Sequence, residues 1–299
     1  MSILVVGSLC VDTTLYVASL PAPGETVIAR SALNSFGGKG ANQALAARMA
    51  GGEVAFLACT GKDSVGQAYR QHLDGHDIDP VTLVVDGETP TGTAFLAVDD
   101  SGENSIVINP GANHALRPEH LDQHRALFEN ASHLLLQLEI PFDTLRHACR
   151  LGRENGVMIM INPSPWSDDF NTEDFPCDLL VVNEHEAAAL LGHRDRTPSR
   201  ELLDELQLQT LLITHGAAPT LVVSRSGEPF KSSPPSVTPV DTVGAGDAFT
   251  GALAVALAEG QALKDAVRFA NTAASLSILK HGAQGATPTR AEIEAALGL

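Results

Sequence analysis

Two acids flank a short glycine-rich turn, and this stretch has the residue types for phosphoryl chemistry. It begins at Asp241, passes through Gly244, Ala245 and Gly246, and presents a second acid, Asp247. An apolar run at helical spacing follows, which predicts a helix that begins at Asp247. Main-chain N–H groups crowded at a helix start favour an anion, and a carboxylate there could accept a proton from an attacking hydroxyl. Alternatively, Asp247 is only the cap of that helix.

A second glycine-rich turn lies near residue 40. Gly37, Gly38 and Gly40 precede an alanine-rich stretch that predicts a helix over 44–50, and Lys39 and Asn42 stand beside them. The turn is either a simple helix entry or a place where the backbone approaches a ligand closely. It lacks the GxxxxGK[ST] pattern, so it is not a P-loop.

Polar residues also follow the predicted strands. They are Asp12, Glu139, Asn162, Asn183 and Thr214. Ligands of open α/β sheets bind in the crevice at the carboxyl ends of the strands. Five such residues, together with two glycine-rich turns, indicate a binding site there.

Hydrophobic periodicity predicts an alternation of strands and helices along most of the sequence. Strands are expected at 3–7, 54–59, 81–85, 133–138, 157–161, 179–182, 210–214 and 221–224. Helices are expected at 64–75, 118–130, 142–155, 184–191, 247–259, 262–280 and 290–297. This alternation predicts an α/β fold with a parallel, doubly wound sheet and helices on both faces. Two hairpin-like segments, at about 12–36 and 92–109, form a small insertion, so residues 1–299 are expected to be a single domain.

Composition limits the classes of partner. The net charge is −17, which argues against nucleic acid, although local N–H groups can still bind phosphate. An acidic surface is also compatible with a salt-rich cytoplasm. No apolar run is long enough to span a membrane, and no basic leader precedes an apolar segment. Four widely spaced cysteines indicate reduced thiols and a cytoplasmic protein.

Several of these motifs together resemble the PfkB family of carbohydrate kinases, most closely its ribokinase branch. They are GGKGANQA at 37–44, QLEIP at 137–141, NPSP at 162–165, VNEHEA at 182–187 and DTVGAGDAF at 241–249. The resemblance implies a three-layer α/β/α fold with a mostly parallel sheet and a small β-sheet lid, which the two hairpin segments would form. It implies ATP-dependent phosphorylation of the terminal hydroxyl of a pentose, with D-ribose as the expected substrate, and a homodimer formed through the lid.

The resemblance also implies roles for single residues. Asp247 would be the catalytic base and Gly244, Ala245 and Gly246 the anion hole. The sugar-contacting positions would be Cys10, Asp12, Gly38, Lys39, Asn42 and Glu139, with Asp247. The ATP-binding positions would be Asn183, Glu186, Thr214, Gly216, Gly246 and Asn271. Glu186 would hold Mg²⁺ through water. An activating K⁺ would lie among Asp241, Val243, Ser277, Lys280 and Gly282.

Three positions depart from the family pattern. Cys10 replaces an asparagine that would reach the sugar, and a thiol cannot reproduce the hydrogen bonds of an amide. The site could therefore favour 2-deoxyribose, or water could fill the gap and ribose remain the substrate. Pro219 replaces a glycine of the nucleotide loop, and Ala286, after Gly285, replaces a serine that often supports the cation site. A ketohexose kinase, a nucleoside kinase and a non-catalytic sugar sensor remain the alternatives.

Overall fold

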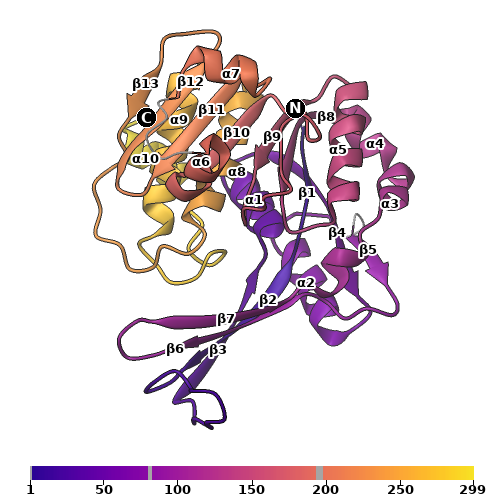
Figure 1. The fold of residues 1–299 in the computed structure, drawn as a ribbon, viewed down its shortest axis with the longest axis vertical. Helices are drawn as coiled ribbons and strands as arrows, with labels where there is room; N and C mark the ends of the chain where they lie inside the picture. Colours follow the sequence, from indigo (N-terminus) through magenta and orange to yellow (C-terminus); the bar gives the residue numbers. More distant parts are fainter. Residues whose placement is uncertain (1, 80–82, 193–197) are drawn as a thin grey trace.

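In the computed structural model, which describes residues 2–79, 83–192 and 198–299, a large sheet carries helices on both faces and a small sheet projects from one end (Figure 1). Within these residues the large sheet has nine strands in the order β13-β12-β11-β10-β9-β8-β1-β4-β5. They are β1 Ser2–Val6, β4 Glu53–Gly61, β5 Leu83–Asp86, β8 Ala131–Gln137, β9 Met158–Asn162, β10 Leu179–Asn183, β11 Thr210–His215, β12 Ala218–Ser224 and β13 Phe230–Ser232. Strands β11 through β5 pair in parallel, and β12 and β13 are antiparallel at one edge. The predicted α/β class is confirmed.

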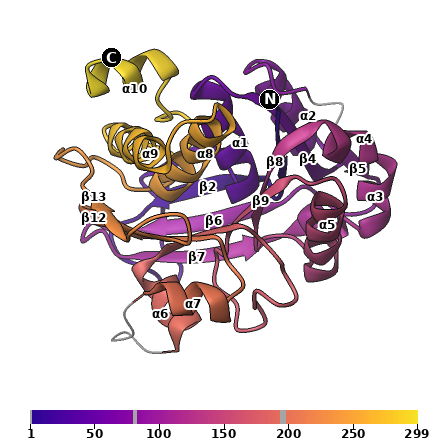
Figure 2. The same ribbon diagram turned by 90° about the horizontal axis from the view of Figure 1, so that it is seen from above.

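The helices form two layers, one on each face of the large sheet (Figure 2). One layer holds α1 Lys39–Met49, α2 Ser64–Asp74, α8 Ala245–Ala258, α9 Leu263–Ser277 and α10 Arg290–Leu297. The other holds α3 Pro118–Gln123, α4 Arg125–Asn130, α5 Phe142–Glu154, α6 Glu184–Leu191 and α7 Arg200–Glu205. Successive residues of a strand point to opposite faces, so Ile3 and Val5 pack under the first layer and Leu4 and Val6 under the second. No helix in the described part of the chain is long and apolar enough to cross a membrane.

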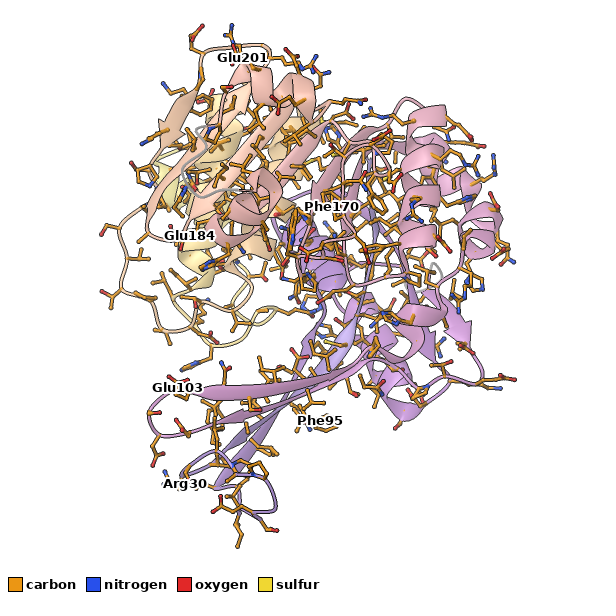
Figure 3. The ribbon with its side chains drawn as sticks, viewed as in Figure 1. Arg30, Phe95, Glu103, Phe170, Glu184 and Glu201 are labelled. Carbon is orange, nitrogen blue, oxygen red and sulfur yellow. The ribbon has the colours of Figure 1, made fainter. Side chains whose placement is uncertain are left out.

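The small sheet, called the lid below, has its strands in the order β3-β2-β6-β7. They are β2 Cys10–Tyr16, β3 Ser31–Gly37, β6 Thr93–Val98 and β7 Asn104–Asn109, which agrees with the two predicted hairpin segments. Arg30 and Asp100 join the two hairpin ends through hydrogen bonds of 2.6 and 2.8 Å. Phe95, Arg30 and Glu103 are labelled on the lid in Figure 3.

Short segments connect the lid to the large sheet. Strand β1 ends at Val6 and β2 begins at Cys10. Between them, the Asn113 side chain, on the short helix η2 (Gly111–Ala115), accepts from the N–H of Leu9 at 2.9 Å and donates to its carbonyl at 2.7 Å. The hydroxyl of Tyr69 on α2 donates to the carbonyl of Gly37 at 2.6 Å. Side chains of the main body therefore fix both roots of the first lid hairpin.

The helix predicted at 118–130 is wrong as a single element, because α3 and α4 meet at a break at His124. In a continuous helix the N–H of His124 would bond the carbonyl of His120. Here the imidazole Nδ1 of His124 takes that carbonyl at 2.8 Å, and the N–H of His124 bonds Leu121 instead. A side chain that competes for a backbone acceptor in this way ends the helix.

The helix predicted at 44–50 begins earlier, because α1 starts at Lys39. Gly38 is its N-cap, with φ +90°, a conformation that favours glycine. A Cβ on Gly40 would lie 2.5 Å from the N of Ser8, so only glycine allows the first turn to pack on the end of β1. The consequence for the site is that Asn42 and Gln43 lie on α1 rather than in a loop.

Other differences are small. The sequence pattern does not predict η2, α7 or the three-residue strand β13, which are short elements with weak periodicity. Helix α8 begins at Ala245, two residues before its predicted start. Residues 81–82 of the strand predicted at 81–85 lie outside the described residues, and β5 follows at Leu83.

Candidate active site

Asp247 lies at the start of α8 and is the centre of a buried polar cluster. Gly244 caps the helix with φ +81°, so Asp247 is in the first turn and its side chain is only 6% exposed. Its Oδ2 accepts from Asn42 Nδ2 and its Oδ1 from Gln43 Nε2, both at 3.0 Å. Because first-turn N–H groups of a helix have no carbonyl partner within it, the carboxylate stands beside donors that suit an anion.

Glutamines behind Asp247 complete its support, and the sequence motifs do not single them out. Gln43 is fully buried, and its Oε1 accepts from Gln137 Nε2 at 2.6 Å. Its Nε2 also lies 3.2 Å from the Oδ1 of Asn162, one of the predicted strand-end residues. Gln137 ends β8, and Gln43 follows Asn42 directly. A polar residue at the end of an apolar strand was a signal in the sequence, but only the fold shows that these side chains meet.

The predicted sugar residues gather where β1, β2 and α1 meet. Glu139 Oε2 accepts from the hydroxyl of Ser8, and it accepts from the main-chain N–H of Lys39 at 3.0 Å. The thiol of Cys10 donates to Asp12 Oδ1 at 2.8 Å. The structure therefore brings Cys10, Asp12, Lys39 and Glu139 to the root of the lid, together with Ser8, which the sequence analysis did not single out.

Burial governs the ionisation of Asp12. Burial raises its pKa, the hydrogen bond from Cys10 opposes that effect, and the negative charge of Glu139 adds to it, so the pKa lies above its usual value. For Cys10, burial and then the nearby Asp12 raise the thiol pKa strongly. The thiol therefore stays protonated and remains a donor to Asp12. An ionised Asp12 has no hydrogen to donate and can only accept.

We expect Asp12→Asn to stabilise the fold increasingly as pH rises. A carboxyl group whose pKa is raised in the folded state stabilises that state when protonated, and this contribution is lost as pH rises through the folded pKa. The free energy of unfolding of the variant should exceed that of the parent protein by a margin that grows from about pH 4 towards neutrality. Chemical denaturation at a series of pH values measures it.

Asp63→Asn is the matched control for this pH series. Burial pushes the pKa of Asp63 up, but hydrogen bonds from Gly66 and Thr91 outweigh it and hold the pKa below its usual value. Its ionised form therefore stabilises the fold, so the free-energy difference between this variant and the parent should have the opposite slope. Equal slopes for both variants would contradict the assignment for Asp12.

The predicted nucleotide residues Asn183 and Thr214 lie away from the root of the lid, at the ends of β10 and β11. Asn183 caps α6, whose first residue Glu184 is labelled in Figure 3. The Asn183 Oδ1 accepts from the N–H of Glu186 at 2.8 Å, and Glu186 Oε2 accepts from the N–H of Asn183 at 2.9 Å. Thr214 pairs with Asn183 across the two strands. The two residues are therefore adjacent, and the capping box fixes the orientation of Glu186.

Gly216 and Asn271 border the hairpin that follows β11. Gly216 adopts φ +56° in the turn before β12, and Pro219 lies within that strand. Asn271 on α9 accepts from the hydroxyl of Thr220 at 2.8 Å and donates to the carbonyl of Ser232 at 3.0 Å. Its side chain thus joins α9 to β12 and β13, a structural use that the sequence did not reveal.

The predicted cation residues form two loops that pack together behind the start of α8. Asp241 accepts from the N–H of Val243 at 3.0 Å and from the N–H of Gly282 at 2.9 Å. The N–H of Asp241 in turn donates to the carbonyl of Ile278 at 3.3 Å, next to Ser277 at the end of α9. The side chain of Lys280 points elsewhere, with Nζ 3.8 Å from Glu292. Only backbone groups of Lys280 can belong to this loop pair.

No group of three or more His, Cys, Asp or Glu side chains that could hold a metal occurs in the described ranges. The arrangement instead offers single carboxylates next to backbone groups. Asp12 and Asn42 can bind neighbouring hydroxyls, Asp247 can accept a proton, and the first turn of α8 can receive an anion. This combination suits the transfer of a phosphoryl group to an alcohol.

Comparison with known proteins gives full-length matches. Residues 1–290 match the model of the pfkB family of carbohydrate kinases. A ribokinase of Bacillus subtilis is 37% identical over 300 residues, covering 98% of each chain. One of Haemophilus influenzae is 35% identical over 296 residues, covering 96% of this chain and 95% of its own. The structure of Arabidopsis thaliana ribokinase complexed with ribose and ATP is similar with a TM-score of 0.91 at 29% identity, covering 100% and 99% of the two chains.

Proposed function

This chain belongs to the pfkB family of carbohydrate kinases, and on that basis we propose that residues 1–299 form one kinase domain that transfers a phosphoryl group from ATP to D-ribose, giving ribose 5-phosphate. The observation that carries the proposal is Asp247, buried at the start of α8 and held by Asn42 and Gln43. Similarity to ribokinases over nearly the whole chain supports the choice of sugar.

In the proposed mechanism, Asp247 accepts the proton of the terminal hydroxyl as that oxygen attacks the γ-phosphorus of ATP. An ordinary carboxylate is a weak base for an alcohol, so proton transfer follows the formation of the new P–O bond. The N–H groups of residues 244–246 stabilise the negative charge of the transferred group, whereas the N–H of Val243 donates to Asp241. A helix start with a glycine cap presents these groups without a side chain in the way.

The sugar is bound by the residues at the root of the lid. Asp12 and Asn42 bind neighbouring hydroxyls of the sugar. Gly38 and Lys39 contribute backbone groups, and Glu139 holds the N–H of Lys39 in place. Since β2 carries Asp12 and α1 carries Asn42, the sugar touches the lid and the main body at once.

The nucleotide binds along Asn183, Glu186, Thr214, Gly216, Gly246 and the region of Asn271. Glu186 has one carboxylate oxygen engaged by Asn183, and the other is an oxygen ligand of the kind Mg²⁺ prefers, through water. The ion would neutralise charge on the phosphates. Activity should disappear when EDTA is added and return with Mg²⁺; turnover that persists in EDTA would contradict this assignment.

A monovalent cation, K⁺ by preference, binds between the loops of Asp241 and Gly282. Carbonyl groups of Val243, Ser277, Lys280 and Gly282 would be its ligands, with the carboxylate of Asp241. These loops support Gly244 directly, because a Cβ there would lie 2.6 Å from Ala283. An equal kcat in K⁺ and in tetramethylammonium, a cation too large for such a site, would count against it.

Cys10 governs the choice between D-ribose and 2-deoxy-D-ribose. The Cys10 thiol donates to Asp12 and offers the sugar no amide. We expect Cys10→Asn to raise the ratio of kcat/KM for D-ribose over 2-deoxy-D-ribose by about 10-fold, since an unpaired hydroxyl costs about 1–3 kcal/mol. A coupled ADP-release assay on both sugars measures it, with Cys10→Ser as the control of similar size. An unchanged ratio in the Asn variant would contradict this role.

The same assay over a panel of sugars separates the alternatives. Turnover of D-ribose with little turnover of fructose, inosine or 2-deoxyribose supports the proposal. A preference for 2-deoxyribose would indicate that the missing amide at position 10 defines the substrate. Sugar binding without ADP release from any substrate would favour the non-catalytic sensor.

Lid-to-lid contact would give a homodimer. The lid exposes large apolar side chains, with Val107 66%, Ile108 62%, Phe95 50% and Leu33 48% exposed, and patches of this kind mark protein contacts. Light scattering tests the assembly, and a monomer at micromolar concentration would refute it.

We place the reaction in the cytoplasm, because it uses ATP and because the four cysteines are free thiols. Recovery of the protein from a membrane or secreted fraction would refute that location.

A further inference from the structure

A line of hydrogen bonds leads from Asp247 away from the proposed reaction centre to helix α2. Asn42 donates to Asp247, and the Oδ1 of Asn42 accepts from Gln284 Nε2 at 3.0 Å. Gln284 Nε2 also donates to the hydroxyl oxygen of Tyr69 at 2.8 Å, and Gln284 Oε1 lies 2.8 Å from His72 Nε2. Asn42, Gln284 and Tyr69 are 8%, 8% and 0% exposed, so little water is present to replace a lost partner.

The carboxylate end of this line determines the direction in which each member donates. An ionised carboxylate only accepts, so Asn42 must present its Nδ2 to Asp247 and its Oδ1 to Gln284. Gln284 must then present its Nε2 to Asn42, which leaves its Oε1 facing His72. Because a carbonyl oxygen cannot donate, the hydrogen of this last bond must be on His72 Nε2.

Turning Gln284 over would break two bonds and force a change of tautomer at the third. Its oxygen would face the Oδ1 of Asn42, where two acceptors repel each other. It would also face Tyr69, whose hydroxyl hydrogen already goes to the carbonyl of Gly37 at 2.6 Å. The Gln284 amide would meet His72 Nε2, which could accept only in the other tautomer. A donor at position 72 therefore favours the orientation in which Asn42 donates to Asp247.

His72 is held in place by contacts of its own. Its ring stacks on Phe36 with centroids 4.1 Å apart and an interplanar angle of 17°, at the end of lid strand β3. His76 follows one turn later, with ring centroids 4.6 Å apart, and its Nδ1 bonds the carbonyl of His72 at 2.8 Å. Burial lowers the pKa of His72, the bond to Gln284 opposes this, and His76 lowers it further. The ring is therefore neutral near pH 7 and has a single N–H to donate.

We propose that His72 is a positioning residue of the sugar site: its Nε2–H orients Gln284, and Gln284 orients the Asn42 amide that contacts both the sugar and the catalytic carboxylate. The inference rests on the proposed function of Asp247 and Asn42. His72 itself touches neither substrate. It acts through two amides, and its N–H adds to the constraints that Asp247 and Tyr69 place on their orientation.

Three substitutions at one position test the direction of donation. His72→Gln keeps an N–H near the place of Nε2, His72→Met fills similar space with no donor, and His72→Glu provides an acceptor. We expect kcat/KM for D-ribose to stay within about 2-fold for Gln, to fall about 10-fold for Met and to fall further for Glu, while KM for ATP stays constant. Gln71→Met, which removes a donor at the exposed neighbouring position of α2, is the control and should match the parent.

The comparison of Gln with Met decides the proposal. Equal kcat/KM for D-ribose in these two variants would overturn it. So would a rise in KM for ATP as large as the rise in KM for D-ribose. The thermal midpoints of His72→Met, Gln284→Leu and the double variant give a test that needs no turnover. Their effects should be strongly non-additive, and additive midpoints would overturn the hydrogen bond itself. Absence of kinase activity in the parent protein, with non-additive midpoints, would instead refute the proposed function and leave the hydrogen-bond line standing.

Discussion

Asp247→Asn is expected to lower kcat with D-ribose and ATP by a factor of about 10²–10⁴, the usual contribution of a general base. The carboxylate accepts from two amides, Asn42 Nδ2 and Gln43 Nε2, at 3.0 Å each. An asparagine offers only one acceptor, so its own amide must face one of these donors. Steady-state kinetics measures the loss of turnover, and calorimetry measures D-ribose affinity, which should change by less than about 10-fold.

Asp265→Asn is the matched control for this substitution. Asp265 is also in the first turn of a helix, α9, but it is exposed. The same chemical change there should leave kcat within a factor of about 2, as is usual for an exposed surface position. If Asp247→Asn kept near-normal activity, the assignment of Asp247 as the base would be wrong.

Gly244→Ala is expected to lower kcat by about 10²–10³, the cost of misplacing donors that stabilise developing negative charge. Gly244 has φ +81°, and an added Cβ would lie 2.6 Å from the Cβ and 2.9 Å from the Cα of Ala283. A left-handed conformation alone costs a non-glycine residue about 1–2 kcal/mol. Both effects push the start of α8 away from the loop of Gly282. The thermal midpoint should therefore fall by about 2–8 °C, as differential scanning calorimetry would detect.

Gly246→Ala is the control for Gly244→Ala, because it involves neither a left-handed conformation nor crowding. Its φ is not positive, and an added Cβ would have no neighbour within 4 Å. Alanine is also the better helix former, so the thermal midpoint of this variant should not fall. A drop of the same size in both variants would show that crowding against Ala283 is not the cause.

Much of the fold follows from local patterns. The buried strands of the parallel sheet are apolar runs with polar residues at their ends, and Glu184–Leu191 and Arg290–Leu297 have the predicted bounds. The break at His124 could not be predicted, because it depends on one side chain competing with the backbone for a carbonyl. The early start of α1 depends on contact with Ser8, which is distant in sequence.

The site was predicted in part for a similar reason. Asp247, Asn42 and the strand-end residues are visible in motifs, and the structure brings Asp247 and Asn42 into contact. Gln43, Gln137 and Gln284 were missed because residue type and strand position alone do not show which buried partners a glutamine meets. Their value depends on partners that lie 94 to 242 residues away in the sequence. Asn271 is the reverse case. Its position in the sequence predicts contact with the nucleotide, but its side chain joins α9 to β12 through the hydroxyl of Thr220.

The lid has a consequence for how such a protein can change over evolutionary time. Its strands contribute no buried residue to the two apolar clusters of the main body, and only the partly buried Val11 and Phe36 pack against one of them. Its position is set at a few roots, by Asn113 on Leu9 and Tyr69 on Gly37. If the lid binds the sugar and a second subunit as proposed, substitutions on it would alter substrate choice or assembly with little change to the apolar clusters of the main body. Such a division would let one catalytic body acquire new substrates through changes in a part that shares little of its apolar core.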